Sequence, residues 1–149
     1  MPSYNPFSVV GGGAAGVPIS LASATDIFTW TVPFKCMVLR SGVTITTTVD
    51  SSNSIVVDFD HRPTAGSDTS RITGAFGTIT IPTATAQGEV IYQDMDATLM
   101  AATPYANEGD EIIVTVTTAA VSTGVGNPWF IVEYIPEVAG NNTVMTETD

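Results

Sequence analysis

The residues of this chain that could carry acid–base chemistry are few and lie close together. The one histidine, His61, follows Asp58 and Asp60 and precedes Arg62. A carboxylate beside an imidazole can accept and return a proton. Neighbouring residues of a strand point to opposite faces, however, and no serine or cysteine nucleophile accompanies the pair at suitable spacing. The pattern therefore favours a strand that ends in a loop, with a local pair of Asp and Arg, and we expect His61→Ala to cost little stability.

The sequence also lacks the residues that other kinds of catalytic site require. Cys36 lies in the apolar stretch 32–38, which predicts a small buried side chain. A single cysteine cannot form a disulfide framework, and a single histidine cannot build the several-histidine metal site of cupin-like enzymes. The glycine-rich run 11–16 lacks the preceding strand and the lysine of a phosphate-binding loop. The sequence thus predicts a protein that is not an enzyme, with no catalytic residue and no cofactor.

Short acidic runs are the one pattern that suits a metal ion. Calcium prefers several oxygen ligands, which neighbouring carboxylates can supply. None of the runs has the spacing of an EF-hand loop, and solvated acidic loops are the commoner explanation. The sequence assigns no metal ligand but leaves a structural calcium open. The runs are Asp58 and Asp60, Asp94 and Asp96, and Glu108, Asp110 and Glu111.

The charge balance excludes two classes of partner. Fifteen acidic residues stand against four basic ones, which gives a net charge of −11. Binding to nucleic acid or to an anionic membrane needs clustered basic side chains, and this chain has none. Residues 1–25 carry no charged side chain, but prolines and glycines interrupt every apolar run, so they indicate neither a signal peptide nor a membrane span. The simplest expectation is synthesis in a cytoplasm.

The elements that must position these residues are strands. Thr, Val and Ile make up 52 of the 149 residues, whereas only three are Leu, and residues branched at Cβ favour a pleated surface. Apolar and polar residues alternate with period two through residues 26–137, in about eight short segments separated by turn residues. The one plausible helix covers residues 94–102. These features predict an all-β, two-sheet antiparallel β-sandwich, and we favour a jelly roll.

Composition divides the chain into three zones. Residues 1–25 are rich in Gly, Ala, Ser and Pro and are expected to form an extended arm. Residues 26–137 contain the alternating segments and are expected to form the β-sandwich domain. Residues 138–149 are expected to form a polar tail.

One predicted strand is apolar on both of its faces. The segment 128–135 contains Trp129 and Ile131 on the face opposite to Phe130, Val132 and Tyr134, although a strand of a simple sandwich usually shows one face to water. Either the chain covers this second face itself, or the face is a subunit or partner interface with Trp129 and Ile131 as anchors. Tyr4 and Phe7, from the arm, are the other predicted interface residues.

Three segments carry a resemblance to a known family. They are Thr-Trp-Thr-Val-Pro-Phe at residues 29–34, Gly-Asp-Glu-Ile-Ile-Val at 109–114 and Phe-Ile-Val-Glu-Tyr-Ile-Pro at 130–136. With them, residues 25–137 resemble the capsid decoration (cement) proteins of tailed bacteriophages. The resemblance implies a jelly-roll-like fold and a homotrimer on the outer capsid surface that clamps major capsid protein subunits, after synthesis in the host cytoplasm. It implies no particular site residues.

A binding module is the alternative function. A jelly roll from a phage tail or fibre could bind carbohydrate or a receptor through aromatic side chains, and Trp129, Tyr92 and Tyr105 are the candidates for that role. Saturable binding on a glycan array would favour this alternative over a decoration protein.

Overall fold

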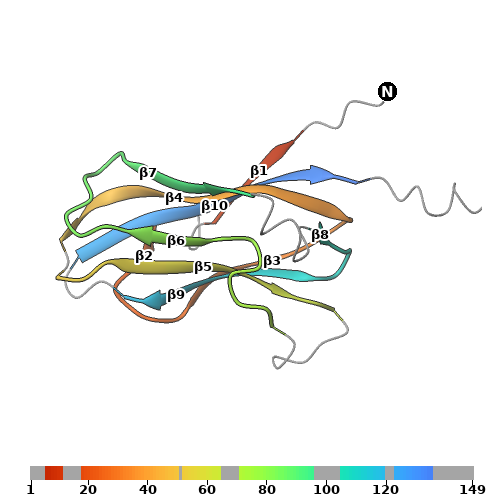
Figure 1. The fold of residues 1–149 in the computed structure, drawn as a ribbon, viewed down its shortest axis with the longest axis horizontal. Helices are drawn as coiled ribbons and strands as arrows, with labels where there is room; N and C mark the ends of the chain where they lie inside the picture. Colours follow the sequence, from red (N-terminus) through yellow and green to blue (C-terminus); the bar gives the residue numbers. More distant parts are fainter. Residues whose placement is uncertain are drawn as a thin grey trace, which may run out of the picture.

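Two antiparallel sheets lie face to face in the computed structural model (Figure 1). The structure describes residues 6–11, 18–50, 52–64, 71–95, 105–119 and 123–135. Within these ranges the regular elements are ten strands and no helix. The strands are β1 (Phe7–Val10), β2 (Ile19–Ser20), β3 (Asp26–Thr31), β4 (Cys36–Asp50), β5 (Ile55–Arg62), β6 (Thr78–Ile81), β7 (Val90–Asp94), β8 (Tyr105–Ala106), β9 (Glu111–Thr118) and β10 (Thr123–Tyr134).

The strand order is that of a jelly roll. The first sheet, here called the large sheet, has the order β1-β10-β4-β7, with β2 paired to β10 and β8 paired to β4. The second, the small sheet, has the order β3-β9-β5-β6. Without the two-residue strands β2 and β8, the chain changes sheet at every connection between the eight strands except that from β5 to β6, and the first strand lies beside the last, which is the jelly-roll arrangement. The predicted all-β sandwich and its jelly-roll topology are therefore confirmed.

The first strand corrects the expected arm. β1 pairs with β10, with Phe7 opposite Val132 and Val9 opposite Phe130, and β2 pairs with β10 further along. The expectation that residues 1–25 form an arm outside the sandwich is therefore wrong for 7–10 and 19–20. Two inward residues, Phe7 and Val9, are too short a pattern to stand out between proline and glycine residues. Tyr4 and the tail 138–149 lie outside the described residues.

The predicted helix is also corrected at its start. Asp94 is the last residue of β7, where it lies opposite Arg40 of β4, so no helix begins there. The remainder of the expected helix, residues 96–102, lies outside the described part of the chain. No helix among the described residues is long and apolar enough to cross a membrane.

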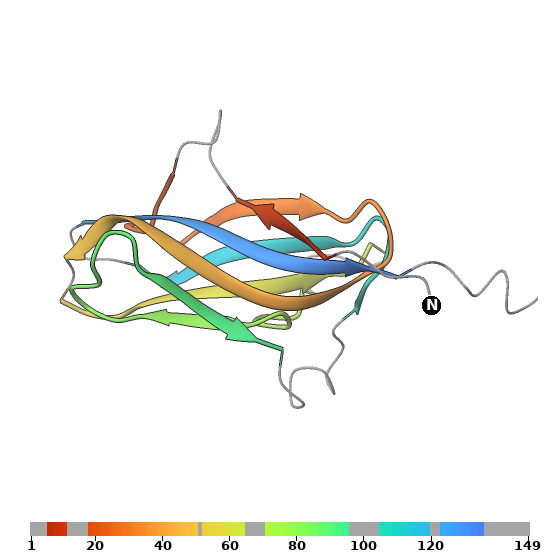
Figure 2. The same cartoon turned by 90° about the horizontal axis from the view of Figure 1, so that it is seen from above.

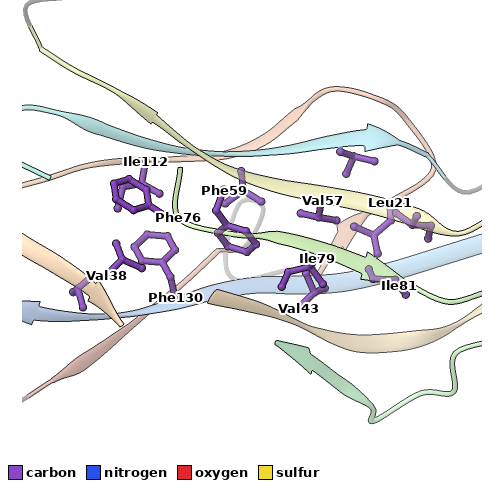
Figure 3. Packing of buried hydrophobic residues seen from close by; sticks show 14 of the residues in the cluster. Leu21, Val38, Val43, Val57, Phe59, Phe76, Ile79, Ile81, Ile112 and Phe130 are labelled. Atoms are coloured by element: carbon purple, nitrogen blue, oxygen red, sulfur yellow. The ribbon is translucent and has the colours of Figure 1, made fainter. Parts of the chain in front are cut away.

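The core lies between the two sheets and is built from alternate residues of each strand. Phe59 of the small sheet meets Phe130 of the large sheet edge to face at 6.3 Å, and both side chains are fully buried (Figure 3). Trp30 packs on Phe130 from β3, at 5.4 Å between ring centroids. Such tilted ring pairs add to the burial of apolar area. These contacts fix which face of β10 is inner, with Phe130 and Val132 inward.

A proline inside the central strand β10 is tolerated because of where its missing donor points. Gly11 N donates to Pro128 O at 2.7 Å, at the end of β1. The N–H and C=O of one residue point to the same side of an antiparallel strand, so the N–H that Pro128 lacks faces Gly11 and not β4. The long pairing of β10 with β4, which runs from Tyr134 opposite Cys36 to Thr123 opposite Asp50, is preserved.

Candidate interaction surface

The outer face of the large sheet gathers apolar side chains in register across four strands. Val10 lies opposite Trp129, Trp129 opposite Gly42, and Gly42 opposite Tyr92. The next row is Ser8, Ile131, Arg40 and Asp94. Figure 2 looks onto this sheet and shows the four strands β1, β10, β4 and β7 side by side. The surface made by these residues together with Thr44 and Val90 is called the Trp129 face below.

Trp129 is held flat against the sheet by two residues of β4. A Cβ atom at Gly42 would lie 2.5 Å from Cζ2 and 2.9 Å from Cε2 of the indole, so the ring passes directly over this glycine. The indole Nε1 donates to Thr44 Oγ1 at 3.0 Å. The missing side chain at position 42 and the hydroxyl at position 44 thus fix the orientation of a half-buried aromatic ring that reaches the surface.

Replacing Gly42 tests this geometry. We expect Gly42→Ala to displace the indole and to lower the free energy of unfolding by about 1–3 kcal/mol, because overpacking forces neighbouring groups to move. Denaturant unfolding would measure the loss, and the near-ultraviolet circular dichroism of the native state would report the moved ring. Thr80→Ala, on the exposed side of β6, is the control, and an equal response from both variants would contradict the tight contact.

Tyr92 is oriented by a charged pair. The guanidinium carbon of Arg40 lies 4.3 Å from the ring centroid of Tyr92, and Arg40 Nε donates to Asp94 Oδ1 at 2.5 Å. The hydrogen bond to Asp94 raises the pKa of Arg40 above its ordinary value. The Arg40 guanidinium therefore interacts with both the Asp94 carboxylate and the Tyr92 ring. Arg40 and Asp94 together contribute no net charge to the Trp129 face.

The predicted interface residues fall at two places. Trp129 and Ile131 are half-buried on the Trp129 face, so the chain covers them only in part. Phe7 lies instead at one end of the sandwich, with its ring centroid 6.5 Å from that of Trp30 and 5.6 Å from that of Phe34. The site prediction is therefore not one continuous patch, and its role in binding stays a prediction. Tyr4 lies outside the described residues.

The residues considered for sugar binding are partly brought together. Tyr92 and Trp129 lie on the same face, on the two strands that flank Gly42. The side chain of Tyr92 is exposed. Tyr105 lies on β8 opposite Met37, a separate position along β4.

The expectation that His61 lacks partners is wrong. His61 is buried at the end of β5, with Nε2 2.8 Å from Asp110 Oδ2. The same carboxylate accepts hydrogen bonds from the backbone N–H and the hydroxyl of Thr64 and from the backbone N–H of Asn107. Burial alone would raise the pKa of Asp110, but the hydrogen bonds from His61, Thr64 and Asn107 outweigh it and lower that pKa. The group is a structural anchor that ties β5 to the turn before β9.

Asp60 belongs to a second anchor. Arg71 Nε donates to Asp60 Oδ2 at 2.7 Å, and its two terminal nitrogens donate to the carboxylate of Asp26 at 3.0 and 2.7 Å. Arg71 Nη2 also contacts the Thr115 hydroxyl. The pKa of Asp26 is lowered, chiefly by the hydrogen bond from Arg71. One side chain thus joins β3, β5 and β9 on the outer face of the small sheet. The local pair of Asp and Arg that the sequence predicts involves Arg71 and not the adjacent Arg62.

Several of the carboxylates considered as calcium ligands have protein partners. Asp58 Oδ1 accepts from Thr78 Oγ1 at 2.6 Å, Asp94 is bound to Arg40, and Glu111 pairs with Arg62. No group of three or more His, Cys, Asp or Glu side chains that could hold a metal ion occurs within the described ranges. Asp96 lies outside them.

Cys36 is buried and chemically quiet. Burial, followed by the charge of Asp110, raises the pKa of the Cys36 thiol to about 11. The thiolate is the reactive form of cysteine, so little of it exists at neutral pH.

The lowered pKa values of Asp26 and Asp110 predict acid lability. A carboxyl with a lower pKa in the folded than in the unfolded state stabilises the fold above its unfolded value of about 3.9, and that contribution is lost as the pH falls through the folded pKa. We therefore expect the free energy of unfolding to be level from neutral pH down to about 5 and to fall below about 4. Thermal unfolding across this range would measure it. A stability that rises on acidification below pH 4 would contradict the assignment.

The comparisons with known proteins assign this chain to no family. No protein-family model matches the chain, and no curated protein matches it. Among solved structures, the chain is similar to one from a structure described as the capsid of Ralstonia phage GP4, with 12% sequence identity and a TM-score of 0.49 over 89% of this chain and 84% of the other. Values this low do not establish a family.

Proposed function

We propose that this chain is a non-enzymatic structural virion protein that decorates the outer surface of a tailed-phage capsid and cements it by bridging major capsid protein subunits. The observation that carries the proposal is the Trp129 face, an apolar surface with a fixed aromatic anchor on an otherwise acidic jelly roll. The resemblance of residues 25–137 to decoration proteins supplies the setting.

The physical character of the Trp129 face suits a permanent contact within an assembled particle. Val10 is 60% exposed and Tyr92 52% exposed, beside the half-buried Trp129 and Ile131. Contiguous apolar surface of this kind marks interaction sites, and tryptophan and tyrosine are common energetic anchors in them. The indole is already ordered by Thr44, so binding would cost it little rotamer freedom.

The polar residues support a structural role. His61, Asp110, Asp60 and Arg71 are the groups most suited to proton transfer or charge stabilisation, and each is bound to a neighbour that it holds in place. A cement protein needs a rigid domain and a docking surface, and these anchors provide rigidity.

Charge favours the outside of the particle. A chain with a net charge of −11 would be repelled by packed DNA inside a capsid, whereas the outer surface imposes no such penalty. The proposed location is therefore the outer capsid surface, after synthesis in the host cytoplasm, and the proposed state is a homotrimer, a number that rests on the family resemblance. Phe7 and Tyr4, near the start of the chain, are proposed as further contacts to the capsid.

Carbohydrate or receptor binding is the second candidate, and one observation favours it. Trp129 and Tyr92 present two aromatic rings on one face with only Gly42 between them, an arrangement on which sugar rings could stack. Saturable binding on a glycan array that is lost in Trp129→Ala would support this candidate.

Capsid sedimentation tests the proposed function. Undecorated capsids of the phage that encodes this chain would be mixed with the purified protein, pelleted, and heated to follow their rupture. We expect the protein to pellet with capsids in saturable amounts and to raise their rupture temperature. Protein that stays in the supernatant at saturating concentration would contradict decoration, and protein that pellets without stabilising capsids would contradict cementing.

A further inference from the structure

We infer that the Trp129 face is the surface through which copies of this chain contact one another. The inference rests on the proposed function and deepens it, because the Trp129 face would join copies into the oligomer that decorates the capsid, while other surfaces of that oligomer contact the capsid. It rests on the distribution of charge, the exposure of apolar side chains and the occupied hydrogen-bonding groups of that face.

Charge selects the face on which two copies can meet. Each copy carries −11, so copies repel unless they approach through a nearly neutral surface. The Trp129 face carries Arg40 and Asp94, which are paired, and Glu133 of β10 lies at its end. The flanking strand β1 adds no charge. The outer side of the small sheet has four acidic side chains, of which Asp58 and Asp60 are buried, and two basic ones; the six are Asp26, Asp58, Asp60, Glu111, Arg62 and Arg71.

The most exposed apolar side chains of this face lie on its two outer strands, β1 and β7. Val10 and Tyr92 lie at the two ends of the row through Trp129, and Val90, which is 48% exposed, lies beside Tyr92 on β7. A sheet face is most fully covered by another extended, gently twisted surface, as when two sheets pack about 10 Å apart. Another copy of this chain provides such a surface.

The hydrogen-bonding groups of the face favour an apolar occupant over a sugar. Trp129 Nε1 is already bonded to Thr44, and Arg40 is bonded to Asp94 and stacked on Tyr92. Sugar sites combine aromatic rings with polar groups that are left to bind hydroxyls. Here the indole N–H of Trp129 and the Nε–H of Arg40 are already bonded within the chain, which suits contact with apolar side chains of a second copy.

The first test is the mass of the full chain in solution. Sedimentation equilibrium at micromolar concentration is expected to show a closed oligomer. Val10→Glu places a charge on the face without removing a core contact, and we expect it to raise the dissociation constant at least tenfold, as a 1.4 kcal/mol loss would. Trp129→Glu is expected to act in the same direction. Thr80→Glu, which adds the same charge to the outer side of β6, is the matched control and is expected to leave the mass unchanged.

The second test locates the contact. Val10→Cys and Thr80→Cys each add one exposed thiol, because the native Cys36 is buried. We expect a thiol reagent to label position 10 several-fold more slowly as the protein concentration rises, and position 80 at a constant rate. Equal labelling of both positions would overturn the inference.

The remaining outcomes separate the inference from the proposed function. A monomeric wild type that still coats capsids would overturn the inference and leave decoration intact. An oligomer that Val10→Glu does not weaken would place the contact elsewhere and overturn it too. A dimer that Val10→Glu dissociates would support the inference while contradicting the proposed trimer. A monomer that binds glycans through Trp129 would overturn both.

Discussion

Asp110→Ala is expected to destabilise the domain by about 3–5 kcal/mol, because removing the buried carboxylate leaves its hydrogen-bond donors buried without an acceptor. Four donors would lose their acceptor at once: His61 Nε2, two groups of Thr64 and the backbone N–H of Asn107. Denaturant unfolding at neutral pH would measure the change. Glu89→Ala removes an exposed carboxylate and is expected to stay within about 0.5 kcal/mol of the wild type.

A double-mutant cycle with His61→Ala would separate the pair from the rest of the anchor. His61 also lies 5.2 Å from Phe76 between ring centroids, so its loss removes packing as well as a hydrogen bond. We expect both single variants to be destabilised and the double variant to lose less than their sum. Strict additivity would mean that the two side chains do not interact in solution.

Deleting residues 1–20 is expected to have the other large effect. The deletion removes β1 and β2, and with them Val9, which packs against the core, and Phe7, which is 37% exposed and contacts the rings of Trp30 and Phe34. The deletion thereby loses partly buried apolar contacts, which lowers the free energy of unfolding. It also leaves one edge of β10 unpaired, and an exposed apolar edge strand promotes aggregation. The truncated chain is therefore expected to aggregate or to unfold well below the wild-type temperature.

Point variants distinguish loss of the strand from loss of chain length. Phe7→Ser with Val9→Ser changes the two inward residues of β1, whereas Ser8→Thr with Val10→Thr changes the two outward ones. Thermal unfolding is expected to show a large loss for the inward pair and little for the outward pair. A truncated protein with wild-type stability would instead return residues 1–20 to the role of an independent arm.

The sandwich could be predicted from the sequence because its signal is repeated. Fifty-two β-branched residues and period-two alternation recur in strand after strand, and one misassigned segment does not change the class. β1 was missed because only Phe7 and Val9 point inward, between a proline and a glycine-rich run. The start of the helix expected at residue 94 was wrong because Asp94 pairs across strands with Arg40, a contact that local sequence does not reveal.

The two anchors and the Trp129 contact depend on long-range pairing. His61 and Asp110 are 49 residues apart in the sequence, and Trp129 and Thr44 are 85 apart. Trp129 could be recognised as an outward residue from alternation alone. That Gly42 lies beneath it, and that Tyr92 completes the row, follows only from the register of β10, β4 and β7. Similarly, Asp60 and His61 do point to opposite faces, as expected, but each has a partner from another strand or loop.

Electron cryomicroscopy of capsids mixed with this protein tests the central claim most directly. The proposed function predicts added density on the outer surface, at regular positions, into which the jelly roll fits so that it bridges neighbouring major capsid protein subunits. The Thr80→Glu control is predicted to give the same density, and Trp129→Glu weaker density or none. Saturated mixtures whose capsids carry no added density, or density only inside the shell, would contradict the claim.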